Sequence, residues 1–176
     1  MFTGLAGELA RALVDDDIHC VVGDAAEGYN PTHDVCRLVI DAAVRMATWI
    51  DKKPVENFAF NLVGRPDQPG GDVSDAVSLS LDEAALARKL RVARRYAEMA
   101  GEVTAALNAW GVDAFGKEYF QRVGDFAQVR DPKVPPQYEQ YGEKRVDAGT
   151  YTHVIRYHEH VLPLSEVLQR TGDGSR

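Results

Sequence analysis

The chain has 176 residues, a formal net charge of -7 and 45% hydrophobic residues. This length fits one domain with a core of its own. The acidic balance and the lack of a long Lys/Arg cluster argue against nonspecific nucleic-acid binding, which needs a basic stripe. No apolar run is long enough to span a bilayer, and residues 1–17 do not resemble a secretion signal. We therefore expect a single domain over 1–176, cytoplasmic, without a nucleic-acid partner or a membrane span.

The first part of the chain alternates between helical and extended patterns. Apolar residues recur with helical spacing over 5–13, and a continuous apolar run over 18–22 is typical of a parallel strand covered on both faces. A helical stripe follows over 31–49, with a proline or threonine placed to start it. Another strand is expected over 58–63. This order predicts a helix followed by a βαβ unit.

The middle of the chain is expected to form a strand and a long helix. Residues 75–79 make a third short strand, and Ser80 with Glu83 forms a capping box that predicts the start of the helix. Gly101 is expected to interrupt or kink this helix before it continues to Trp110. Its basic residues indicate a solvated face or an anion-binding surface; they are Arg88, Lys89, Arg91, Arg94 and Arg95.

Residues 125–150 are expected to be an extended irregular segment, because Pro, Gly and charged residues interrupt any periodicity. Apolar content recovers over 151–161, and a closing helix is expected around 164–168. Cys20 and Cys36 are interpreted as small buried hydrophobic residues in a reducing compartment rather than as a disulfide.

The turn between the first strand and the second helix concentrates the chemistry of the chain. Such turns are exposed while their flanks are rigid, which is why α/β proteins often bind ligands there. The functional side chains of this turn are Asp24, Glu27, Tyr29, Asn30, His33 and Asp34. Function is therefore sought first in this segment.

The residues of this segment resemble a known family. The order Asp-x-x-Glu-Gly-Tyr-Asn-Pro-Thr-His-Asp, an apolar helix, a strand ending in Asn-Leu-Val-Gly and a capped helix with Arg-Lys-Leu is similar to the later portion of the PIG-L (LmbE-like) sugar deacetylases. The resemblance extends from about residue 18 to 155–160 and is sharpest around His33. It implies a layered Rossmann-like α/β fold with a partly parallel sheet that lacks the family's first strand. It also implies hydrolysis of the N-acetyl group of an N-acetylglucosamine-type sugar or glycoconjugate, at a zinc held by two histidines and an aspartate.

Carried over by position, His33 matches the histidine ligand that ends the family's His-Pro-x-His element. Asn30 takes the place of the leading histidine, and it can donate a hydrogen bond to an oxyanion but cannot exchange protons at neutral pH. Asp24, Glu27 and Tyr29 are candidates for contacting the sugar. The family's His-Pro-Asp-Asp-Glu motif, which supplies the remaining ligands and the general base, has no counterpart in this sequence.

Each of these residues also has a structural interpretation. His33 could orient the first helical turn, and Asp34 could stabilise the helix dipole there. The carboxylates near His33 could instead hold a hard cation. In an extended strand His158 and His160 would share a face and could meet one ion, or they could fill polar edges of a packed segment.

Two function classes follow from the sequence. The first is a zinc-dependent deacetylase whose missing ligands come from elsewhere. The second is a non-catalytic sugar-binding or interaction module derived from such an enzyme. In either case the absent first strand would leave an unpaired sheet edge, which favours a homo-oligomer.

Overall fold

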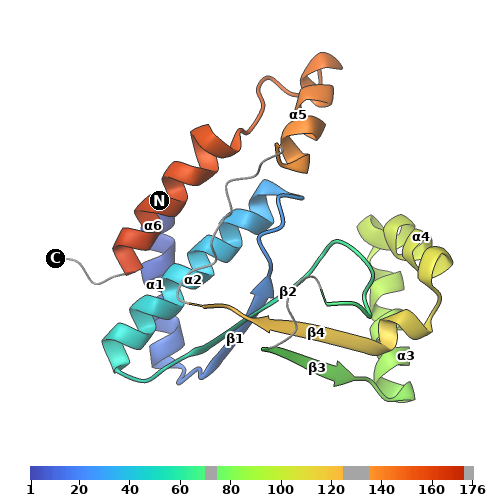
Figure 1. The fold of residues 1–176 in the computed structure, drawn as a ribbon, viewed down its shortest axis with the longest axis horizontal. Coiled ribbons are helices and arrows are strands. Elements are labelled where there is room, and N and C mark those ends of the chain that lie inside the picture. Colours follow the sequence, from blue (N-terminus) through green and yellow to red (C-terminus); the bar gives the residue numbers. More distant parts are fainter. Residues whose placement is uncertain (70–74, 125–134, 173–176) are drawn as a thin grey trace. The chain divides into compact units, whose positions relative to one another are not determined.

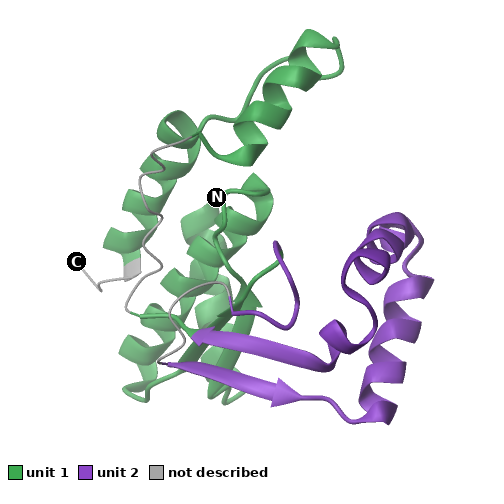
Figure 2. Ribbon diagram, turned by 45° about the vertical axis from the view of Figure 1, so that its right-hand side comes forward, with its two compact units in different colours: residues 1–62, 122–176 green, residues 63–121 purple. Residues whose placement is uncertain are grey.

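A computed structural model describes residues 1–69, 75–124 and 135–172 (Figure 1). The chain divides into two compact units (Figure 2). The first comprises Met1–Leu62 and Arg122–Arg176, and the second comprises Val63–Gln121. The residues expected to carry the function all belong to the first unit.

The first unit contains most of the helices. Its elements are α1 (Phe2–Asp15), β1 (Cys20–Asp24), α2 (Pro31–Asp51), β2 (Glu56–Phe60), α5 (Gln137–Asp147), the π-helical turn η3 (Tyr157–Val161) and α6 (Leu162–Gly172). β1 pairs with β2 in parallel, from Cys20 opposite Glu56 to Asp24 opposite Phe60. Because α2 connects the two strands, this part of the chain is a βαβ unit, as predicted.

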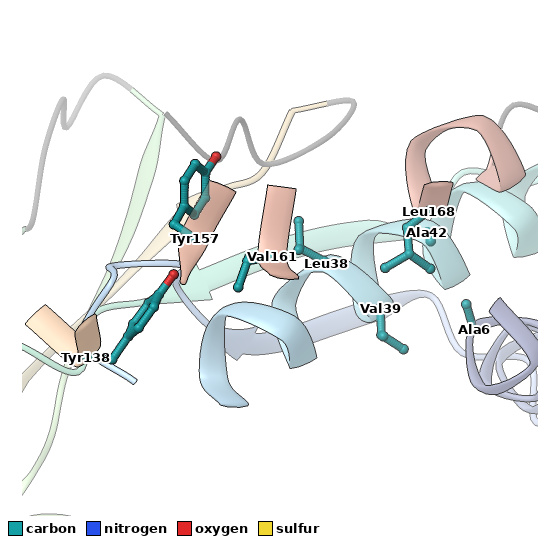
Figure 3. Close-up of a cluster of buried hydrophobic side chains, with 8 residues drawn as sticks. All are labelled: Ala6, Leu38, Val39, Ala42, Tyr138, Tyr157, Val161 and Leu168. Atoms are coloured by element: carbon teal, nitrogen blue, oxygen red, sulfur yellow. The ribbon is translucent and has the colours of Figure 1, made fainter. Parts of the chain in front are cut away.

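The core of the first unit is built around α2 (Figure 3). One buried cluster joins α2 to α1, α5, η3 and α6, and it consists of Ala6, Leu38, Val39, Ala42, Tyr138, Tyr157, Val161 and Leu168. A second cluster joins α1 to the later turns of α2, and it consists of Ala10, Leu13, Ala43, Val44 and Ala47. The helix that begins beside the candidate site is therefore the most firmly packed element of this unit.

The second unit is formed around an antiparallel strand pair. β3 (Ala76–Ser80) pairs with β4 (Lys117–Arg122), and the helical elements between them are α3 (Glu83–Arg95), η1 (Ala97–Met99), α4 (Ala100–Trp110) and η2 (Asp113–Gly116). Leu90 and Ala114 are buried, while Val77, Leu79 and Val92 are exposed. Apolar burial is therefore thinner in this unit than around α2.

The prediction of an α/β fold with a partly parallel sheet is confirmed, since the strands show both parallel and antiparallel pairing. Among the helices of the described ranges, none combines the length and the apolar character that crossing a bilayer requires.

The first two strands begin and end at different residues than predicted. β1 begins only at Cys20 because Ile18 still takes part in the turn that closes α1, where its N–H donates to the Leu13 carbonyl over 2.9 Å. β2 ends at Phe60, before the Asn-Leu-Val segment that the apolar run had included. β1 was expected to be covered on both faces, but Cys20 and Val22 are exposed. That expectation was wrong.

The cysteines are correspondingly more accessible than expected. Cys20 and Cys36 were predicted to be buried, yet both are free thiols on exposed residues. Cys20 lies on the open face of β1, and Cys36 lies on the outer side of α2, between buried Asp34 and buried Leu38. The absence of a disulfide between them agrees with the prediction.

The helices of the second unit also differ from the predicted long helix. The N-cap of α3 is Asp82, whose carboxylate accepts the Ala85 N–H over 2.7 Å, while Ser80 still belongs to β3. The interruption comes at Tyr96, where the backbone leaves the helical region, and Gly101 lies inside α4. The predicted capping box and the predicted break at Gly101 were therefore wrong, and strand β4 was not foreseen.

The segment predicted to be irregular contains a helix. Residues 137–147 form α5, while 125–134 lie outside the described residues. The extended strand considered for His158 and His160 does not occur, because residues 157–161 form η3 and lead directly into α6. Tyr157 and Val161 are buried while Glu159, halfway between them, is exposed, so burial does not alternate every second residue as it would in a strand.

Candidate functional site

The centre of the candidate site is a contact between Asp24 and His33. Asp24 is the last residue of β1, and His33 lies in the first turn of α2. Oδ2 of Asp24 meets Nδ1 of His33, and the two side chains are 25% and 38% exposed. Nδ1 is therefore the nitrogen held by the carboxylate, and Nε2 has no protein partner within the described ranges. An imidazole oriented in this way can bind a metal or exchange a proton through Nε2.

Asn30 starts the helix that carries His33. It is the N-cap of α2 with extended backbone angles (φ -138°, ψ 125°), and its Oδ1 accepts the Thr32 N–H over 2.9 Å. Pro31 occupies the first helical position, where its missing N–H costs nothing. The cap engages only the carbonyl oxygen of the Asn30 side chain, which leaves its amide nitrogen as a hydrogen-bond donor.

Glu27 joins the loop after β1 to the loop after β2. Its Oε1 accepts from Asn61 Nδ2 over 2.8 Å, and its Oε2 accepts from the Leu62 backbone N–H over 2.6 Å. Tyr29, in contrast, is 42% exposed. Three residues were predicted to contact a sugar. Tyr29 is presented to solvent, Glu27 also has a structural role, and Asp24 is in contact with His33.

Asp34 fixes the turn from within. It is 3% exposed, and its Oδ1 accepts the Gly28 N–H over 3.2 Å. Burial raises the pKa of Asp34, although backbone N–H groups of Gly28 and Glu27 oppose this. Gly28 has φ +70°, and a Cβ there would lie 3.2 Å from Cβ of Pro136, just before α5. The turn is thus held between α2 and the start of α5.

A buried polar cluster beneath the site was missed by the sequence analysis. Arg37 is fully buried, and its Nη2 lies 2.6 Å from Oδ1 of Asp41 and 2.6 Å from Oδ1 of Asn57. Asn57 Nδ2 in turn donates to Asp41 over 2.8 Å, and Arg37 Nη1 donates to the Phe58 carbonyl over 3.1 Å. Burial lowers the pKa of Arg37, and the charges of Asp41 and Asp24 oppose this.

A sequence signal for this cluster does exist. Asp34, Arg37 and Asp41 follow one another at three and four residues, so they share one face of α2. That face borders the apolar stripe of the helix, and all three residues are buried. This spacing does not reveal the fourth member of the cluster, Asn57, which lies on β2.

Gly23 allows β1 to approach α2 closely above this cluster. A Cβ at position 23 would lie 2.8 Å from Cδ1 of Ile40 and 3.4 Å from Nη1 of Arg37. Real Cβ contacts do not occur at the shorter distance. Glycine at this position therefore leaves room for the end of the Ile40 side chain between the strand and the helix that carry Asp24 and His33.

The second histidine group does not form a site. His158 and His160 lie in η3 rather than on one face of a strand, and Nδ1 of His160 accepts the Arg156 N–H over 3.0 Å. Nδ1 of His153 lies 3.0 Å from the Thr152 hydroxyl. Within the described residues no group of three His, Cys, Asp or Glu side chains is placed to hold a metal ion.

Comparisons of this chain with protein-family models, with curated proteins and with solved structures find no match. The site itself consists of an oriented imidazole, a helix-capping amide and an exposed phenol at the carboxyl end of a parallel strand.

Proposed function

We propose that this chain carries part of the site of a zinc-dependent deacetylase, which hydrolyses the N-acetyl group of an N-acetylglucosamine-type sugar or glycoconjugate. The contact between Asp24 and His33 is the observation that supports it most directly. The similarity of residues 24–34 to the PIG-L motif supplies the reaction class. The Rossmann-like layering of that family belongs to the same proposal, and the βαβ unit supports it.

His33 suits zinc as one ligand of a larger set. Histidines that bind metals usually donate the N–H of the other ring nitrogen to a carboxylate, which fixes the tautomer and the ring orientation. Asp24 meets Nδ1 in this way, so Nε2 is the ligand atom. A catalytic zinc generally has three protein ligands and an open position. The proposal therefore requires further ligands beyond those that the described residues bring together.

The other residues of the turn have separate roles in this proposal. Zinc, when bound, supplies Lewis-acid polarisation of the acetamide carbonyl. The side-chain amide nitrogen of Asn30 donates to the oxygen that gains negative charge. The phenol of Tyr29 contacts sugar hydroxyls, and so does the Glu27 carboxylate, which also accepts from Asn61 and Leu62.

Zinc binding at His33 is the first test. Zinc is titrated into the full chain while the ring nitrogens of its histidines are followed by NMR. We expect a selective shift of the His33 Nε2 resonance, which Asp24→Asn weakens about tenfold to a hundredfold in zinc affinity. His153→Ala is the matched control, because His153 is exposed and lies away from Asp24 in the sequence. Zinc that shifts only other histidines would contradict the proposal.

Acetate release from N-acetylglucosamine is the second test. Release that requires zinc, disappears in His33→Ala and persists in His153→Ala would support the deacetylase. Binding of the sugar without acetate release, and without zinc at His33, would instead assign the chain to the class of non-catalytic sugar-binding modules. If the chain neither binds the sugar nor releases acetate, and zinc does not bind at His33, both functions are rejected.

A further inference from the structure

We propose that Tyr141, Arg145 and Tyr151 form a binding site for an oxyanion, that is, a carboxylate or phosphate group. The site lies at the end of α5 in the first unit. None of its residues belongs to the turn around His33, so this inference is independent of the proposed deacetylase.

The backbone at the end of α5 brings Tyr151 back toward Arg145. Gly149 has φ +71°, a left-handed conformation that favours glycine, and its N–H donates to the Val146 carbonyl over 2.8 Å. The N–H groups of Thr150 and Tyr151 then donate to the Arg145 carbonyl over 2.8 and 3.1 Å. The position of Tyr151 is thus fixed by the helix end rather than by a free loop.

Two tyrosine rings hold the guanidinium of Arg145. Its Cζ lies 5.8 Å from the ring centroid of Tyr141, one helical turn earlier, and 5.5 Å from that of Tyr151. The two tyrosines are 55% and 47% exposed, so the pair stands at the surface. Stacking on aromatic rings restricts the rotamers of an arginine, so less conformational entropy is lost when a ligand binds.

The hydrogen-bonding capacity of the Arg145 guanidinium is unused in the described part of the chain. Its Nε is buried without an acceptor there, and its guanidinium forms no ion pair with the described carboxylates. The guanidinium of Arg156, in contrast, forms ion pairs with Glu139 and Glu143 of α5. The terminal amino groups of Arg145 are therefore the donors left for a ligand.

The chemistry of this arrangement selects an oxyanion. A planar guanidinium presents two parallel N–H donors that match a carboxylate or a phosphate, and neutral ligands do not compensate its charge. The tyrosine hydroxyls can add hydrogen bonds to the same group. Because the chain has a net charge of -7, a general attraction for anions is not expected. Binding should depend on this local arrangement.

NMR titration of the full chain with sodium phosphate and with sodium acetate tests the proposal, at an ionic strength held constant with sodium chloride. The backbone amides of Thr150 and Tyr151 serve as the readout in every variant. We expect chemical-shift changes that saturate at millimolar anion. The anion that binds more tightly shows whether the site prefers a phosphate or a carboxylate group. Shifts that rise linearly, or that chloride reproduces, would overturn the proposal.

Two variants with the same change of charge separate the site from general electrostatics. Arg145→Gln should weaken anion binding at least tenfold, whereas Lys144→Gln, next to it on the exposed surface of α5, should change it less than twofold. Arg145→Lys should weaken it severalfold, because it keeps the charge and loses the paired donors. Tyr151→Leu, which leaves Arg145 in place, should also weaken it severalfold. Equal effects of Arg145→Gln and Lys144→Gln would reject the site.

Discussion

At the level of single residues, Arg37 is the most demanding group in the first unit. Its side chain is fully buried, and a buried charge is tolerated only when partners compensate its lost hydration. Asp41, Asn57 and the Phe58 carbonyl provide this compensation. The cluster joins α2 to β2, so it also aligns the helix that carries His33.

Replacing only one residue of the buried pair Arg37–Asp41 should therefore lower the free energy of unfolding more than replacing both. We expect Arg37→Met to lower the free energy of unfolding by about 3 kcal/mol, since the Asp41 carboxylate stays buried without the guanidinium. The double variant Arg37→Met with Asp41→Leu should recover much of this loss. Urea denaturation measures both values.

An exposed ion pair provides the control for that experiment. Arg122 and Glu56 lie 2.7 Å apart with side chains 50% and 51% exposed. Arg122→Met should change the free energy of unfolding by less than about 1 kcal/mol. A loss as large as that of Arg37→Met would mean that burial does not determine the cost.

Tyr138 presents the opposite situation, a buried hydroxyl without a hydrogen-bond partner in the described part of the chain. Burial raises the pKa of Tyr138, and the nearby charge of Asp34 adds to this. We expect Tyr138→Phe to raise the free energy of unfolding by about 1 kcal/mol, because it removes an unsatisfied buried group. Thermal unfolding measures the change, and Tyr96→Phe at an exposed position is the control.

The same substitution should alter the alkaline stability of the chain. The pKa of Tyr138 is higher in the folded state than the value of about 10 in an unfolded chain. Its contribution to stability is therefore complete below about pH 10 and is lost as the pH rises toward the folded-state pKa. Tyr138→Phe should lose less stability than the wild type above pH 10. Identical pH profiles would show that Tyr138 ionises without hindrance.

At the level of elements, the sequence predicted those helices whose apolar residues repeat clearly. α1 and α2 have continuous apolar stripes, and the structure confirms them. α5 was missed because its buried positions are Tyr138, Glu139 and Gly142, which do not form a hydrophobic pattern. Glu139 is buried because its carboxylate accepts the Tyr157 N–H over 2.7 Å, a contact between distant segments.

The candidate site was predictable to a similar extent. Local order in the chain placed Asp24, Asn30 and His33 in one turn, and the structure brings Asp24 and His33 into contact. The hydrogen bonds of Glu27 and the cluster around Arg37 were not predictable, because their partners lie on the next strand and the loop after it. Patterns within one element do not reveal partners on another.

The N-cap of α3 offers a direct test at this scale. The sequence favoured Ser80 as part of a capping box, whereas the structure places the cap at Asp82. We expect Asp82→Ala to lower the free energy of unfolding by about 1 kcal/mol, because the Ala85 N–H loses its acceptor. Ser80→Ala should be close to neutral. The reverse order in chemical denaturation would restore the predicted capping box.

At the level of the whole molecule, burial is unequal between the two units. α2 alone contains Leu38, Val39 and Ala42 among its buried residues, whereas α4 has none. Local opening requires less free energy where fewer apolar groups are buried. We expect amide hydrogens of α3 and α4 to exchange faster than those in the middle of α2. Hydrogen exchange followed by mass spectrometry measures this, and equal protection would contradict it.

A second property at this scale concerns association. β1 stands at one end of the strand order, and its Val22 is 48% exposed. We propose that a second copy of the chain pairs along this edge, since unpaired strand edges join other chains. Small-angle scattering should then show a mass above the monomer that rises with protein concentration.

A charge placed on the strand should oppose this association. Val22→Lys should return the mass to that of a monomer, whereas Val92→Lys, at a 63% exposed position of α3, should not. Added salt should strengthen association by screening the net charge of -7. A monodisperse wild-type monomer at every concentration would exclude pairing along β1.

Gly23 has a consequence that reaches beyond its own position. Because Gly23 has no side chain, β1 leaves room for the terminal methyl group of Ile40 in α2. A residue with a Cβ at position 23 requires the terminal methyl group of Ile40 to move, and a shorter residue at position 40 would remove the need for that movement. If the Ile40 side chain cannot move, β1 has to shift away from α2, and Asp24, the next residue, would lose its contact with His33.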